Sequence, residues 1–181
     1  MEIGRALART GFTLVNIKIE VDNSEVLKRF NDLIAMGEDP APALNAVGRV
    51  LKTRIQDGFI TGTAPDGRPW APLKSRAGQP LVDKGHLKNS IDYRVEGNSV
   101  VVGTNLPYAP VHQFGAKIEA KSGKVLRFYV EGRPVFVKRV TIPERPFLPQ
   151  DQLPRDWGTD VIDAIADVIR RSLGDRGRPS S

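Results

Sequence analysis

A short segment around Trp70 limits most strongly how this chain can fold. The sequence Pro65-Asp66-Gly67 predicts a turn, because proline presets φ, aspartate can bond the backbone ahead of it, and glycine accepts positive φ. Pro69 and Pro72 then flank Trp70, and two prolines within four residues exclude a helix interior and a central strand. We therefore expect Trp70 on a stiff, extended loop, where its indole either packs inside its own domain or anchors a partner subunit.

Three amphipathic segments predict helices. The first runs from about Glu25 to Met36, and the second opens at Pro40 and Pro42 and continues to about Gly58. The third begins at residue 158 or 159 and stops at Gly174. Helical spacing gives the second segment an apolar face made of Leu44, Val47, Leu51, Ile55 and Phe59. It gives the third a stripe made of Ile162, Ile165, Ile169 and Leu173, flanked by Val161 and Val168.

Short apolar runs predict strands. Alternation within residues 12–21, with Val15, Ile17, Ile19 and Val21 on one face, is typical of a half-buried strand. Residues 92–96 and 98–103 form one predicted hairpin around the turn Gly97-Asn98, and residues 125–130 and 134–140 form another. We expect an α+β fold, a mainly antiparallel sheet built from hairpins and packed against two or three amphipathic helices. The expected organisation is an N-terminal arm (1–11), a single domain (12–174) and a polar C-terminal tail (175–181).

Both histidines lie in short elements beside the first hairpin. Residues 83–91 predict a short helix, and residues 108–115 predict one or two helical turns closed by a glycine, with Tyr108, Val111 and Phe114 on one face. The segment Ile142 to Leu148 is expected to be extended, since Pro143 and Pro146 interrupt it.

The sequence does not favour a catalytic role. Ser90, Asp92 and His112 can be drawn as a hydrolase triad, but no nucleophile elbow surrounds the serine. The chain has no cysteine and only two histidines, without the spacing of a metal site. We therefore expect neither an enzyme nor a metal or cofactor, and no small-molecule substrate. Structural roles are expected for Asp66, Gly67, Gly97, Asn98, His112 and Phe114.

The net charge of +6 comes mostly from one region. Seven basic residues and two acidic ones lie between Lys117 and Arg139, an excess of five. Such a region can face DNA or an acidic protein surface, and the plainer alternative is a solvated hairpin whose charges protect its edges. In the first interpretation the DNA-facing residues of this basic region (117–141) are Lys117, Lys121, Lys124, Arg127 and Arg133.

The motifs occur in an order that resembles a known family. PDG-x-x-W-x-P-L is followed by G-x-L-x-x-S-I, a G-N hairpin with V-V-V-G-T-N, Y-A-x-x-H-Q-F-G, and finally I-P-E-R-P-F-L at residues 142–148. This series is similar to the bacteriophage Mu-like virion morphogenesis proteins, also described as phage tail completion proteins. The resemblance spans about residues 47–148, with a predicted helix on each side.

The resemblance implies a structural virion protein that acts in head completion or head–tail joining. Such a protein is expected to form a homo-oligomeric ring around the DNA channel, to contact other neck, connector or tail proteins, and to touch packaged DNA without reading its sequence. It would be found at the neck or tail end of the virion, after assembly in the host cytoplasm. No membrane contact is expected, since no segment could span a bilayer and no signal peptide opens the chain. The alternative is a sequence-independent DNA-binding module. The interface residues proposed at this stage are Trp70, Pro72, Arg76, Arg145 and Phe147; Arg145 can alternatively hold carbonyls or a carboxylate.

Overall fold

The computed structural model describes residues 39–74, 76–121, 124–130, 132–150 and 152–175, together with Lys28 and Asn31. The predicted arm (1–11), the strand at 12–21 and the tail after residue 175 lie outside this part of the chain. So does most of the predicted first helix, of which only Lys28 and Asn31 are described, both helical.

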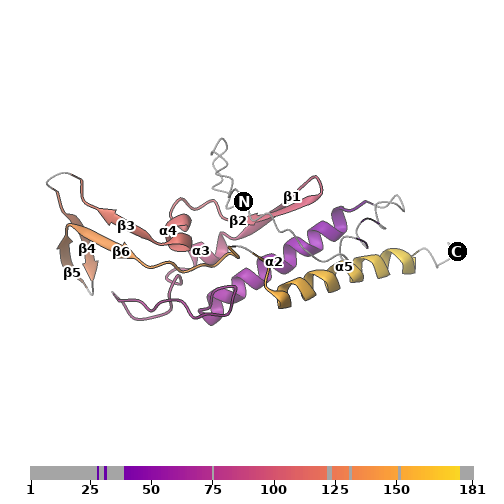
Figure 1. Cartoon of the computed structure of the whole chain (residues 1–181), viewed down its shortest axis with the longest axis horizontal. Helices are drawn as coiled ribbons and strands as arrows, with labels where there is room; N and C mark the ends of the chain where they lie inside the picture. The colour runs from indigo at the N-terminus through magenta and orange to yellow at the C-terminus, as the bar shows by residue number, and fades with distance from the viewer. Residues whose placement is uncertain are drawn as a thin grey trace.

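Two long helices form the body of the molecule (Figure 1). Helix α2 (Ala41–Thr61) begins after Pro40, and Pro42 occupies its first turn, as the sequence predicts. The helix ends at Gly62, whose φ of 74° allows its N–H to donate to the Gly58 carbonyl. The predicted apolar face is confirmed, with Val47 half-buried and four buried members: Leu44, Leu51, Ile55 and Phe59.

Helix α5 (Arg155–Asp175) lies alongside α2 and begins earlier than predicted (Figure 1). It starts directly after Pro154, whose carbonyl accepts a hydrogen bond from Gly158. The extra turn adds Trp157 to the packing face, so the buried stripe is Trp157, Val161 and Ile165. This corrects the sequence prediction, which placed Val161 at the edge of the stripe and omitted Trp157.

The first hairpin forms where it was predicted. Strands β1 (Asp92–Glu96) and β2 (Ser99–Gly103) pair antiparallel, and Glu96 lies opposite Ser99. Positive φ at Gly97 fits the two-residue turn between them. The short helices α3 (His86–Asn89) and α4 (Ala109–Phe114) also match the prediction, and α4 ends at Gly115.

The remaining strands form an arm that extends away from the two long helices (Figure 1). Strand β4 (Leu126–Val130) pairs with β5 (Arg133–Val137), and β3 (Ala116–Glu119) pairs with β6 (Arg139–Ile142). The sequence predicted a single strand over 134–140 and none at 116–119. The chain instead leaves β5 at Lys138 and enters a second pairing. Pro134 is accommodated in β5 because each strand of a two-stranded sheet has an open edge.

The α+β class is confirmed. The described strands are distributed over three separate two-stranded antiparallel sheets rather than one larger sheet. The core joins α2, α5, the first hairpin and the loop around Trp70; its members include Leu51, Ile55, Phe59, Trp70, Ile91, Val102, Phe147, Leu148, Trp157 and Val161. In the arm, two-stranded sheets supply little shared interior, so its stability depends on local packing.

Candidate functional site

The indole of Trp70 joins two segments that are far apart in the sequence. It is buried against Phe59, whose ring centroid lies 5.3 Å away in an edge-on arrangement. Its Nε1–H donates a 2.7 Å hydrogen bond to the carbonyl of Pro146. A second aromatic contact, from Phe59 to Phe147 at 5.6 Å, holds the 142–148 segment against the end of α2. The stiff proline-flanked loop thus positions a core tryptophan.

Arg145 binds the same loop through its backbone carbonyls. Its Nε–H donates to Ala71 O at 2.7 Å, and a terminal N–H donates to Pro72 O at 3.0 Å. Its own backbone N–H donates to His112 O at 2.7 Å. Only 6% of the residue is exposed, and this burial lowers the pKa of the guanidinium. Of the two roles that the sequence left open, the structure shows the one in which Arg145 holds carbonyls.

Gln113, for which the sequence predicts no role, completes this arrangement. The side chain is fully buried in α4, and its Oε1 accepts hydrogen bonds of 3.0 Å from the backbone N–H groups of Phe147 and Leu148. Its Nε2 donates to Leu148 O at 2.9 Å. The available signal was a glutamine beside His112 in a short helix whose other residues are apolar. We call Trp70, Gln113 and Arg145 the buried clamp, since together they fasten the 69–72 loop, α4 and the 145–148 segment.

At Gly115, the end of α4 approaches the backbone of the 142–148 segment closely, and this contact supports the buried clamp. The φ of Gly115 is 68°, and a Cβ at this position would lie 2.9 Å from Glu144 N and 3.0 Å from Ile142 O. A larger residue would therefore separate the end of α4 from the 142–148 segment.

Several predicted interface residues belong to the interior. Trp70, Arg145 and Phe147 are buried in their own domain. For Trp70 this is the first of the two alternatives that the sequence left open, and none of the three side chains is exposed for contact with a partner. Pro72 and Arg76 are exposed. Arg76 donates to the carbonyls of Ala77 and Val82, which folds its loop back on itself.

The predicted structural residues have mixed environments. Asp66 is exposed and accepts hydrogen bonds from the backbone and side chain of Arg68, which lower the pKa of its carboxyl group. His112 is half-buried with its ring 5.9 Å from that of Tyr108. Burial, and then the nearby Arg145 charge, lower the pKa of His112. Phe114 is 55% exposed and is not part of the core.

Exposed apolar side chains gather on α4 and the arm. The part of the chain that the structure describes has seven large hydrophobic residues that are exposed, and all but Ile60 lie between residues 108 and 136. Those six are Tyr108, Phe114, Ile118, Val125, Tyr129 and Phe136. Contiguous exposed apolar groups are typical of surfaces through which proteins contact other molecules.

The predicted DNA-facing residues are all exposed on the same arm. Lys117 lies on β3, Lys121 and Lys124 lie in the loop before β4, and Arg127 and Arg133 lie on β4 and β5. The guanidinium carbon of Arg127 is 5.4 Å from the Tyr129 ring centroid and 5.8 Å from that of Phe136. Arg127 also donates a 2.6 Å hydrogen bond to the Tyr129 hydroxyl. Positive charge and aromatic surface are thus combined on one ribbon.

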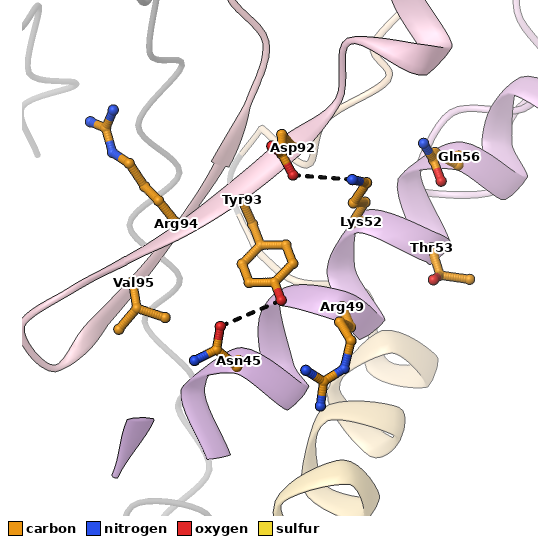
Figure 2. Close-up of a pocket in the computed structure, with 9 residues that line it drawn as sticks. All are labelled: Asn45, Arg49, Lys52, Thr53, Gln56, Asp92, Tyr93, Arg94 and Val95. Atoms are coloured by element: carbon orange, nitrogen blue, oxygen red, sulfur yellow. Dashed lines mark hydrogen bonds and ion pairs between the residues drawn. The ribbon is translucent and has the colours of Figure 1, made fainter. Parts of the chain in front are cut away.

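A polar groove separates α2 from β1 (Figure 2). Its volume is about 640 Å³, and Lys52 crosses it to reach Asp92 at 3.0 Å. Tyr93 packs directly over Gly48, where a Cβ would meet its ring at 2.1 Å, so the hairpin and the helix approach closely at this point. Nothing in the groove resembles a catalytic arrangement.

The hydrolase triad drawn from the sequence is not assembled. Ser90 Oγ is hydrogen-bonded to Leu87 O and Thr104 Oγ1, while Asp92 pairs with Lys52. Within the described ranges no hydrogen bond joins any two of Ser90, Asp92 and His112, and no group of metal-ligating residues occurs. The described helices also include none that is long and apolar enough to cross a membrane.

Comparisons with known proteins agree with the class suggested by the motifs. The sequence profile of the phage virion morphogenesis family matches residues 21–174. The chain is 34% identical over 159 residues to "Mu-like prophage FluMu G protein 2" of Haemophilus influenzae, an alignment that covers 85% of this chain and 96% of that relative. No solved structure matches.

This chain therefore belongs to the phage virion morphogenesis family, and its role is in the assembly of a phage particle.

Proposed function

We propose that this protein is a structural, non-enzymatic component that acts in head completion or head–tail joining, as a ring around the DNA channel at the neck or tail end. The observation that carries the proposal is the arm together with α4, where six of the seven exposed large apolar residues of the described chain lie beside most of the excess positive charge. A ribbon with apolar groups on its open face gains stability when a partner covers it. Assembly through surface complementarity therefore fits the arm better than catalysis does.

Light scattering combined with negative-stain imaging of the purified chain tests this proposal. A closed ring, formed alone or on addition of heads or tails from the host phage, is the expected result and supplies the copy number. A chain that remains monomeric and binds neither heads nor tails would overturn the proposal. The same mixtures identify the neighbouring neck, connector or tail proteins.

A sequence-independent DNA-binding module is the second candidate, favoured by the cluster of exposed cations on the arm. Phosphate contacts of this kind produce binding that falls steeply with salt. A gel shift with a steep salt slope, abolished by reversing charge at Lys121 and Lys124, would support this candidate. The two candidates combine if the ring also retains DNA, in which case the same reversals reduce phage titre without changing the mass of the ring.

A further inference from the structure

One face of the β4–β5 ribbon is built for contact with another protein. Register places Arg127 opposite Phe136 and Tyr129 opposite Pro134, so these four side chains share one face. All four are exposed, whereas the residues between them on each strand are half-buried. We call these four residues the aromatic–arginine face.

This face fits a protein better than DNA. Tyr129 and Phe136 are each more than half exposed, and both rings lie beside the guanidinium of Arg127. Backbone contact with duplex DNA requires cations but gains little from such rings. Tyrosine, phenylalanine and arginine are the residue types enriched at the centres of protein interfaces.

An acidic stripe runs along α5. Asp156, Asp160, Asp163 and Asp167 follow the spacing i, i+4, i+7 and i+11, which places them on one side of the helix. Arg54 pairs with the first two, and Arg170 pairs with Asp167. Arg155 and Arg171 flank the stripe in sequence and balance its charge further, so the negative charge that the stripe offers to a partner is centred on Asp163. Asp163 is exposed and has no ion-pair partner among the described residues.

The two surfaces cannot meet within one subunit. The arm extends beyond one end of the two-helix body, while α5 runs toward the other end (Figure 1). A cyclic ring requires two different faces of the subunit to match each other. Arg127 on the arm and Asp163 on α5, which has no ion-pair partner among the described residues, are opposite charges on two distant surfaces of the same chain, and such a pair meets that requirement.

We propose that the aromatic–arginine face of one copy docks on the acidic stripe of α5 in the next copy. The occupant of the arm is thus a second copy of this chain, with Arg127 directed to Asp163 and its neighbouring aspartates. This inference rests on the proposed ring and specifies which two surfaces close it.

Cross-linking between two single-cysteine variants tests the contact directly, because the chain has no cysteine of its own. Pro134→Cys places a thiol on the aromatic–arginine face, and Thr159→Cys places one on the exposed side of α5 beside the stripe. A mixture of the two full-length variants, treated with a short bismaleimide, should give a covalent dimer. The mixture of Pro134→Cys with Thr53→Cys, an exposed threonine of α2, is the matched control.

Charge reversal provides an independent readout. Arg127→Glu or Asp163→Lys alone should weaken self-association by roughly five- to tenfold, and the two reversals combined should restore it. Asp83→Lys reverses a different exposed aspartate, in the loop before α3, and should have little effect.

The results of these experiments distinguish the proposed contact from the proposed ring. Dimers in the Pro134→Cys and Thr159→Cys mixture alone, with rescue by paired reversal, support the contact. Rings in the wild-type protein without this cross-link overturn the contact and leave the proposed function standing. A wild-type chain that neither cross-links nor assembles on heads or tails overturns both. Reversal at Arg127 that abolishes DNA binding but leaves self-association unchanged assigns the face to DNA instead.

Discussion

The buried clamp and the arm place polar and apolar groups in opposite ways. In the buried clamp, a glutamine, an arginine and an indole N–H are sealed inside the domain, and each is hydrogen-bonded to backbone of another segment. In the arm, Tyr129 and Phe136 are open to solvent on a two-stranded ribbon.

The difference indicates that the buried clamp and the arm have separate roles. A buried polar group that loses its partner destabilises the folded chain by its full desolvation cost, so the buried clamp affects folding. An exposed ring contributes little to folding and can contribute strongly to binding. Variants in the two regions should therefore separate stability from assembly.

Gln113→Leu should have the largest effect on stability. The change removes three hydrogen bonds and leaves the Phe147 and Leu148 N–H groups and the Leu148 carbonyl unsatisfied in the interior. We expect a loss of about 3–5 kcal/mol in the free energy of unfolding, measured by urea denaturation. Gln150→Leu, at an exposed position, is the matched control. Equal stability of the two variants would mean that the buried clamp does not hold the fold.

Arg145→Lys should have a smaller effect. Lysine retains the charge but cannot reach Ala71 O and Pro72 O with a planar fork, so at least one carbonyl loses its donor. The expected loss is about 1–3 kcal/mol, read from the same urea midpoint. Arg76→Lys changes an exposed arginine whose contacts are local and should cost much less. If Arg76→Lys lowered the free energy of unfolding more than Arg145→Lys, the contact of Arg145 with the loop would not be a main source of stability.

The double variant Tyr129→Ser and Phe136→Ser should leave the free energy of unfolding within about 0.5 kcal/mol of wild type. Its self-association, followed by light scattering, should weaken by about tenfold or more, because aromatic rings at interface centres contribute most of the binding energy. Ile60→Ser is the matched control, since Ile60 is the exposed large apolar residue outside the arm and α4. Assembly that survives the double variant would remove the arm from the interface.

Acidification should produce the smallest change. The pKa of His112 is lowered from 6.5 in the folded chain, so the unfolded chain binds this proton more readily. The free energy of unfolding should fall as the pH decreases from above 6.5 toward the lower pKa of His112 in the folded chain. Below that folded pKa, the effect of His112 on stability should no longer change with pH. His112→Gln should flatten the pH dependence of the urea midpoint in this window. A slope equal to that of the wild-type chain would contradict the assigned environment of His112.

Local sequence patterns predicted the elements that depend on neighbouring residues. The apolar face of α2 and the turn at Gly97 follow from helical spacing and from the φ that glycine allows, and both are found. The predicted start of α5 is too late, because the helical period is visible only in its aliphatic residues and Trp157 lies one turn before them.

The sequence by itself determined the α+β class, the position of α2, the presence of α5, the first hairpin and the positive charge of the region that forms the arm, because these depend on period, turn chemistry and charge. Only the tertiary structure decided that β3 pairs with β6 and that Gln113 and Arg145 are buried. Side-chain polarity predicts exposure, but a polar group can be buried when distant backbone satisfies its hydrogen bonds, and that partner is set by packing between segments far apart in the chain.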